Sequence, residues 1–418
     1  MTLEETIIGL ARETKGSARQ VANLSTTVKN RVLLAMAAAL LERKDYIQAQ
    51  NELDLAAGRE KGLSAAMLDR LALSDKVIEA MVTGLREVAA LPDPVGEISE
   101  LQRRPSGIMV GRMRIPLGVI GMIYESRPNV TVDAAALCLK AGNAVLLRGG
   151  SEALHSNLAL AQVLRDCLAA EQLDPAAIQV IPVTDREAVT CMLRLEEQID
   201  LIIPRGGEGL IRFVSENSRI PVLKHYKGVC HVFVDAGADL GMANEIVING
   251  KTQRPGVCNA LETLLVHRDA AAEFLPAVGA RLAVAGVEIR GCPQTLALMP
   301  MAIPAGPDDW GMEFLDLILA VKVVADIDEA MAHIARYGSQ HTEAIITNNH
   351  AHAQRFLREV DSSSVMVNAS TRFSDGGQYG LGAEIGISTT KLHAYGPMGL
   401  RELTTRKFIV YGEGQIRV

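Results

Sequence analysis

The sequence predicts an α/β protein built on doubly wound parallel sheets. Between residues 116 and 250, short continuous apolar segments alternate with helical segments. Apolar runs of this kind are typical of parallel strands that are buried on both faces. The same alternation resumes after residue 258. The chain has 418 residues, which is too long for one ordinary hydrophobic core, so we expect two or three domains.

The first hundred residues are expected to be helical. Apolar residues from Leu33 to Leu41 recur at helical spacing, and charged residues lie off that face. Pro92 and Pro94 mark the end of this region. An alternating segment at 106–115 and another at 406–411 then predict two exposed strands that are far apart in sequence. Together they could form an arm for assembly with another chain.

The strands and helices expected after the helical region fall into two units. Strands of the first unit are expected at 119–123, 144–147, 178–181, 201–203 and 232–234, with helices at 131–141 and 152–170. The second unit is expected to have helices at 270–283 and 326–337 and strands at 319–324, 344–347 and 364–367. We therefore predict a cofactor domain from 1–104 and 116–250, a catalytic domain from 251–400, and an arm from 105–115 and 401–418.

Composition and charge exclude several classes of protein. The formal net charge is -7, which argues against a nucleic-acid binder, because such proteins carry a basic patch. No apolar stretch reaches the length of a membrane span, and the N-terminus lacks the basic region of a signal peptide. The six cysteines show no Cys-x-x-Cys spacing, so a zinc or thioredoxin-type motif is not expected. A cytoplasmic protein without structural disulfides is the expectation.

Two diglycine turns follow predicted strands, at the segments 148–151 and 204–207. The first is Arg148-Gly149-Gly150-Ser151 and the second is Pro204-Arg205-Gly206-Gly207. Glycine allows a backbone to approach a ligand closely, and a helix N-terminus favours anions. An arginine at either turn could pair with the 2′-phosphate of NADP. Ordinary turn chemistry and solvated arginines are the alternatives, and the Gly-x-Gly-x-x-Gly dinucleotide fingerprint is missing.

Cys258 is the candidate nucleophile. Pro255 and Gly256 precede it and indicate an irregular loop, while the apolar run at 263–266 predicts a buried strand. A thiol held on such a loop suits covalent catalysis at a carbonyl. The alternative is a buried, inert cysteine. Asn129 could donate to an oxyanion formed at that carbonyl, or it could be a turn asparagine after proline.

Arg254 and Arg372 lie in loops that are expected to border the same cleft. Arginine binds carboxylate and phosphate groups bidentately, so both residues are candidates to hold an anionic substrate. A surface ion pair is the alternative for each.

Four segments of the chain resemble the aldehyde dehydrogenase superfamily and, within it, the gamma-glutamyl phosphate reductase family. They are 119–131, 147–153, 253–263 and 368–387. The resemblance covers essentially the whole chain. It implies a cofactor domain, a catalytic domain and a β arm for homo-oligomerisation. It also implies Cys258 as nucleophile, Asn129 as oxyanion donor, Glu313 at the cofactor ribose and Arg148 on the adenosine side.

The activity implied by this resemblance is the NADPH-dependent reduction of L-glutamyl 5-phosphate to L-glutamate 5-semialdehyde and phosphate. This is the second step of proline biosynthesis. The reaction passes through a cysteine thioester and needs no metal. Because the acyl phosphate is labile, a separate glutamate 5-kinase is a candidate partner. No Gly-x-x-x-x-Gly-Lys-Ser/Thr loop indicates a fused kinase in the chain.

Two departures from the superfamily pattern stand out. Aldehyde-oxidising relatives carry a glutamate before a Gly-Gly that activates water, but the segment 224–229 has no carboxylate. Tyr395 stands where an arginine is expected. The alternatives are an NAD(P)-dependent aldehyde oxidiser, which the missing glutamate disfavours, and a catalytically silent structural oligomer. The presence of both Cys258 and Asn129 argues against the silent oligomer.

Overall fold

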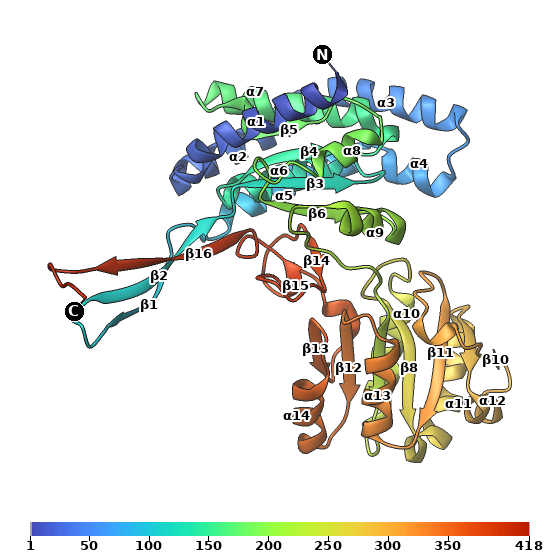
Figure 1. Cartoon of the computed structure of the whole chain (residues 1–418). Helices are drawn as coiled ribbons and strands as arrows, with labels where there is room; N and C mark the ends of the chain where they lie inside the picture. Colours follow the sequence, from blue (N-terminus) through green and yellow to red (C-terminus); the bar gives the residue numbers. More distant parts are fainter. Residues whose placement is uncertain (1, 418) are drawn as a thin grey trace.

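The computed structural model describes residues 2–417 and shows two α/β bodies and a projecting β arm (Figure 1). The first body contains a four-stranded sheet in the order β5-β4-β3-β6, and all neighbouring strands are parallel. The strands are β3 (Val119–Tyr124), β4 (Ala144–Arg148), β5 (Ile178–Val180) and β6 (Leu201–Arg205). The four strands predicted for this sheet from its first four apolar runs are therefore confirmed.

Helices cover both faces of this sheet, as expected for a doubly wound fold. On one face, residues of α2, α5, α6 and α7 form the largest core, whereas α1 and α8 pack on the other face. The helices of this body are α1 (Leu3–Ala22), α2 (Thr26–Glu42), α3 (Lys44–Glu60), α4 (Ala65–Leu71), α5 (Asp75–Ala90), α6 (Asn129–Lys140), α7 (Leu154–Ala170), α8 (Glu187–Met192) and α9 (Glu208–Asn217).

The second body contains a seven-stranded parallel sheet in the order β10-β9-β11-β8-β7-β12-β13. Its strands are β7 (Cys230–Val234), β8 (Leu261–His267), β9 (Glu288–Gly291), β10 (Ile303–Pro304), β11 (Ile318–Val324), β12 (Thr342–Ile346) and β13 (Ser364–Val367). Helices cover both faces here too: α10 (Leu240–Thr252) and α11 (Arg268–Val284) on one, and α13 (Ile327–Tyr337) and α14 (His350–Glu359) on the other. The short α12 (Pro293–Leu298) precedes β10.

The structure corrects the predicted boundary between the two bodies. Strand β7 was expected to close the first sheet, but it pairs with β8 and β12 in the second. Helix α10 packs against α11, so residues 230–250 also lie in the second body. The sequence could not show this, because every residue of β7 is buried and its apolar run suits a central position in either sheet.

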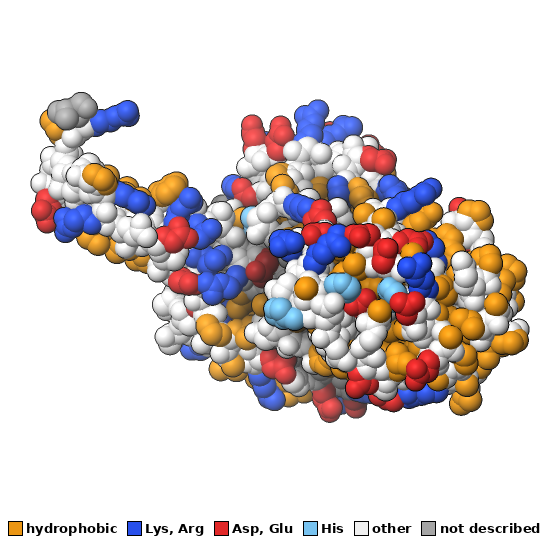
Figure 2. Space-filling model, turned by 90° about the horizontal axis from the view of Figure 1, so that it is seen from below, with side chains coloured by type: hydrophobic (Ala, Val, Ile, Leu, Met, Phe, Trp, Pro, Cys, Tyr) orange, Lys and Arg blue, Asp and Glu red, His pale blue; other side chains and the backbone are white. Residues whose placement is uncertain are grey.

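The arm is a three-stranded antiparallel sheet in the order β1-β2-β16. Strands β2 (Met109–Pro116) and β16 (Thr404–Tyr411) confirm the predicted pairing of distant segments, and β1 (Ile98–Arg103) adds a strand that was assigned to the first domain. The arm projects from the body with hydrophobic side chains along it (Figure 2), among them Phe408, which is 62% exposed, and Val410, which is 58% exposed.

A small hairpin of β14 (Gly386–Ser388) and β15 (Gly396–Met398) connects the two bodies. Its neighbours Ile385 and Leu403 and its own Met398 belong to the core of the first body, although 251–400 was predicted to be catalytic domain throughout. The chain therefore returns from the second body and packs on the first before it enters the arm. Among residues 2–417, no helix is both long and apolar enough to cross a lipid bilayer.

Candidate active site

Cys258 lies in the turn between α10 and β8, at the end of the second sheet that faces the first body. The turn is closed by a hydrogen bond from Ala260 N to Val257 O. The thiol of Cys230 donates to the Cys258 carbonyl oxygen at 3.2 Å. Gly228 packs so closely that a Cβ there would lie 1.9 Å from the same oxygen. The backbone of the candidate nucleophile is therefore held from two sides.

The Cys258 thiol is neutral in the resting protein. The residue is half-buried, and desolvation of its sulfur raises the pKa of the thiol to about 12. The nearby positive charge of Arg205 acts in the opposite direction, while the charges of Glu313 and Glu384 add to the increase in pKa. Because the thiolate is the reactive form, this cysteine needs a proton acceptor when it attacks a substrate.

Two histidines supply such acceptors. A nitrogen of His225, a nitrogen of His341 and the Cys258 sulfur all lie within 4.8 Å of one another. Burial lowers the pKa of His225 to about 4 and that of His341 to about 3, so both imidazoles are neutral at pH 7. His225 Nδ1 lies 3.0 Å from the Ile387 carbonyl oxygen, which can only accept. The proton is therefore on Nδ1, and Nε2 carries a free lone pair.

The sequence interpretation missed both histidines. His225 lies in the segment 224–229 that precedes β7, and His341 lies immediately before β12. A titratable side chain directly before a buried strand was the available signal for His341, whereas His225 had no local signal. Carboxylates do lie close enough to affect the thiol, but they come from distant segments that contain Glu313 and Glu384.

The structure places Arg205 near the thiol and outside the group of residues that line the large cavity of the first body. A Cβ on Gly386 would lie 3.1 Å from the Arg205 guanidinium. Its charge lowers the pKa of both Cys258 and Asp133. Arg205 is predicted to bind cofactor; its position beside the thiol also suits an anionic group next to the nucleophile.

Arg254 and Arg372 lie close together beside the thiol. Burial lowers the pKa of Arg372, and the positive charge of Arg254 lowers it further. Arg372 Nε donates to Gln253 Oε1 at 2.8 Å, which leaves the rest of its guanidinium free. Neither forms an ion pair among the described residues. Two free guanidinium groups therefore border the cleft, as expected for an anionic substrate.

Asn129 is the first residue of α6, and its Nδ2 donates to Asp133 Oδ2 at 2.9 Å. Burial raises the pKa of Asp133 to about 6. One amide hydrogen of Asn129 is therefore engaged and the other is available. Glu313 Oε1 accepts a hydrogen bond from Gly228 N at 2.9 Å, so it lies beside the backbone that contacts Cys258. Tyr395 has a buried hydroxyl without a hydrogen-bond partner.

A cavity of about 700 Å³ opens at the carboxyl ends of β3 and β4. Gly150 and Ser151 of the first diglycine turn line it, together with Arg148 and Arg186. The Arg148 guanidinium donates to the carbonyl oxygens of Gly149, Thr184 and Asp185, whereas Arg186 is exposed and its side chain forms no hydrogen bond within residues 2–417. The size and the position of the cavity suit a dinucleotide, because parallel sheets bind ligands at the carboxyl ends of their strands.

The second diglycine turn does not line this cavity. Gly207 N donates to Glu125 Oε2 at 2.9 Å, and a Cβ on Gly206 would lie 2.4 Å from the same oxygen. Glu125 itself lines the cavity, as do Gly209 and Leu210 just after the turn. Pro204, Gly206 and Gly207 therefore do not line the cavity themselves, and the two glycines contact Glu125, which does.

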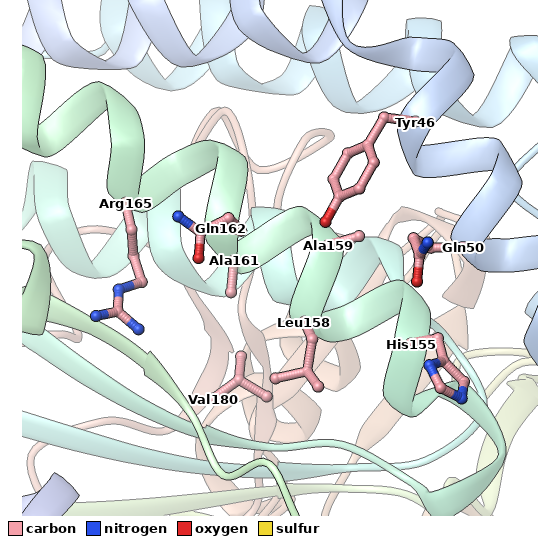
Figure 3. Close-up of a pocket in the computed structure, with 9 residues that line it drawn as sticks. All are labelled: Tyr46, Gln50, His155, Leu158, Ala159, Ala161, Gln162, Arg165 and Val180. Carbon is pink, nitrogen blue, oxygen red and sulfur yellow. The ribbon is translucent and has the colours of Figure 1, made fainter.

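A smaller hollow of about 220 Å³ lies between α3 and α7 (Figure 3). Tyr46 and Gln50 of α3, His155 and Arg165 of α7 and Val180 of β5 are among the residues that line it. The hollow has no cysteine and no carboxylate in its lining. It lacks the groups that acyl transfer requires, so the cleft at Cys258 is the candidate active site.

The comparisons with known proteins agree with this geometry. The model of the aldehyde dehydrogenase family matches residues 4–291. The chain belongs to the aldehyde dehydrogenase family. Within this family it groups with proteins named gamma-glutamyl phosphate reductase. It is 63% identical to the proteins of that name from Desulfotalea psychrophila and Geotalea daltonii, over the full length of both chains in each comparison.

A solved structure of similar sequence gives the same result for the fold. The crystal structure of gamma-glutamyl phosphate reductase from Thermotoga maritima is 48% identical, with a TM-score of 0.97. The match covers 99% of this chain and all of that one. The aldehyde dehydrogenase-like fold and the oxidoreductase class that the sequence predicted are thereby confirmed.

Proposed function

We propose that this aldehyde dehydrogenase family member reduces L-glutamyl 5-phosphate to L-glutamate 5-semialdehyde and phosphate, with NADPH as reductant, in proline biosynthesis. The observation that carries the proposal is the position of the Cys258 thiol. Its sulfur lies within 4.8 Å of two neutral imidazoles, and arginines lie beside it. The names of the full-length relatives support the choice of an acyl phosphate as substrate.

In the first half-reaction the Cys258 sulfur attacks the acyl carbonyl. The thiol proton passes to the free Nε2 of a neighbouring imidazole, and we assign this role to His225, whose Nδ1 is fixed by the Ile387 carbonyl oxygen. The remaining amide hydrogen of Asn129 and the charge of Arg205 stabilise the oxyanion. The carbon–oxygen bond to phosphate then breaks and leaves a thioester on Cys258.

NADPH, when bound, supplies the hydride that brings the thioester carbon to the aldehyde level. Ser151 and the arginines of the large cavity would hold its adenosine half, and Glu313 would hold the ribose near Cys258. As the aldehyde leaves, the carbon–sulfur bond breaks and the imidazole returns its proton to sulfur. The Cys258 thiol is restored, and the leaving phosphate takes up one proton from solvent, so atoms and charge balance over the cycle.

The candidate substrate contacts follow from charge. Arg254 and Arg372 are free to bind the phosphate or the carboxylate of the substrate bidentately.

We also propose that the arm pairs with another copy of the chain, because its exposed hydrophobic strand residues are unusual for a surface in water. A separate glutamate 5-kinase remains the candidate supplier of the labile substrate.

The reverse reaction tests the proposed function. Pyrroline-5-carboxylate, NADP and inorganic phosphate should give NADPH, and omission of phosphate should stop turnover. Cys258→Ser should lose almost all activity, because an unactivated hydroxyl is a far weaker nucleophile than a thiolate. Cys191→Ser, at the other half-buried cysteine, is the matched control and should remain active. Activity close to that of the wild type in Cys258→Ser would refute the covalent mechanism.

A further inference from the structure

The Cys258 thiol and the two histidines beside it form a set of potential metal ligands that the proposed reaction does not use. We propose that Cys258, His225 and His341 form a binding site for a zinc-like divalent cation, which reversibly masks the nucleophile. Sulfur and imidazole nitrogen are the ligands that zinc prefers in proteins, and Cys/His₂ with one open position is a plausible coordination set. The ligand atoms lie within 4.8 Å of one another, so modest side-chain movement would close the site.

Both imidazoles are arranged as zinc-bound histidines usually are. In such sites, the ring nitrogen that does not bind metal forms a hydrogen bond that fixes the ring. His225 Nδ1 donates to the Ile387 carbonyl oxygen at 3.0 Å, and His341 Nδ1 shares a hydrogen bond with Thr342 Oγ1 at 2.9 Å. Nε2 of each ring is left to bind.

The free nitrogen of His341 is the strongest single indication of a ligand. His341 is fully buried, and its Nε2 has no hydrogen-bond partner. A buried polar atom without a partner costs free energy, commonly about 1 to 3 kcal/mol. One nitrogen of this ring lies within 4.8 Å of the Cys258 sulfur and of a His225 nitrogen. Because Nδ1 is engaged with Thr342 Oγ1, we assign Nε2 to the site, where a bound cation would satisfy it.

The charges around the site are mixed. Glu313 and Glu384 are negative groups that act on Cys258, and Arg205 is a positive one. Arg372 and Arg254 add further positive charge beside the thiol, so the ligand atoms and not the net charge carry the proposal. The buried Cys230 sulfur lies 3.7 Å from His341 Nδ1 and donates to the Cys258 carbonyl oxygen, and it is not part of the cluster of three ligand atoms. The imidazoles need not lose protons to bind, because both are already neutral.

Binding is balanced by the release of one proton. The cation replaces the thiol hydrogen, the sulfur–metal bond forms, and both imidazoles donate lone pairs. A metal-bound thiol is deprotonated outright. The inhibitory consequence rests on the proposed function, since a coordinated sulfur cannot attack a carbonyl. The binding site itself depends only on the geometry.

Cobalt(II) is a suitable probe for this site, because a thiolate bound to it gives a charge-transfer band in the near ultraviolet. Titration of the full chain, purified without metal, should give this band with one equivalent of Co²⁺, and Zn²⁺ should abolish it. Cys258→Ser should lose the band. His341→Gln should bind at least about tenfold more weakly, and Thr342→Val, which keeps all three ligands, should weaken binding about 10- to 100-fold.

Two controls separate the possible outcomes. Cys191→Ser should bind Co²⁺ as the wild type does, and melting curves without metal should show that each variant is folded. Zn²⁺ should inhibit the reductase with the same apparent affinity, and a chelator should restore activity. A thiolate band without inhibition would refute the masking role. Absence of the band, or a band that survives in Cys258→Ser, would refute the site. If the band appears in a protein that lacks reductase activity, the proposed function fails and the site stands.

Discussion

Gly228→Ala tests whether the close approach of two backbones positions the nucleophile. A Cβ at residue 228 would lie 1.9 Å from the Cys258 carbonyl oxygen and 2.6 Å from its Cα, and contacts below 3.0 Å essentially never occur. The two backbones must therefore separate by about 1.1 Å, the difference between 1.9 Å and 3.0 Å. Because both Cys258 atoms belong to the backbone, no side-chain rotation can relieve the contact.

A displacement of about 1 Å at a reacting atom can cost about 100-fold in rate. We therefore expect kcat of Gly228→Ala to fall by about 100-fold, while the fold and the affinity for NADPH are largely retained. Steady-state kinetics, NADPH fluorescence titration and thermal melting measure the three quantities. Gly9→Ala is the matched control, since nothing lies within 4 Å of a Cβ at that helical position. An unchanged kcat in Gly228→Ala would show that this contact does not hold the nucleophile.

Four further variants test other parts of the protein. Asn129→Ala should lower kcat by about 100- to 1,000-fold with unchanged NADPH affinity; an effect confined to affinity would argue against the oxyanion role. Arg148→Ala should reduce the preference for NADPH over NADH, and Arg186→Ala should do so too, because its exposed guanidinium lines the same cavity; unchanged cofactor ratios would exclude both as selectors. Lys251→Met breaks a buried ion pair with Glu262 at 2.6 Å and should destabilise the fold by about 3 to 5 kcal/mol, which denaturant unfolding measures; a change well below 1 kcal/mol would contradict this.

The sequence predicted local features well and long-range pairing poorly. The turn at Cys258 and the parallel strands could be recognised because glycine, proline and apolar runs act locally. The sheet to which β7 belongs could not, because a strand buried on both faces has no sequence mark of its neighbours. Strand β1 in the arm was missed for a different reason: its residues are mostly exposed, and its pairing with β2 has an irregular register between Ser99 and Gln102.

The chemical environment of the thiol was the part least visible in the sequence. His225 and His341 are 116 positions apart by their residue numbers. They approach each other only because the loops before the neighbouring strands β7 and β12 meet at one end of these strands. Arg205 was correctly noted at the end of β6, but only the folded chain shows that its guanidinium points toward Gly386 and the thiol. Roles of this kind depend on tertiary contacts, whereas the nucleophile could be proposed from its own loop.

The fate of the Cys258 thioester in the absence of phosphate tests most directly whether this protein is an acyl-phosphate reductase. Enzyme, pyrroline-5-carboxylate and NADP are mixed rapidly in phosphate-free buffer, and NADPH and free glutamate are measured against time. We predict a burst of no more than one NADPH per Cys258, no accumulation of glutamate, and sustained turnover once phosphate is added. Continuous NADPH formation with matching glutamate release would show that water deacylates the enzyme, with Glu384 or Glu313 as the base, and would contradict the assignment as an acyl-phosphate reductase.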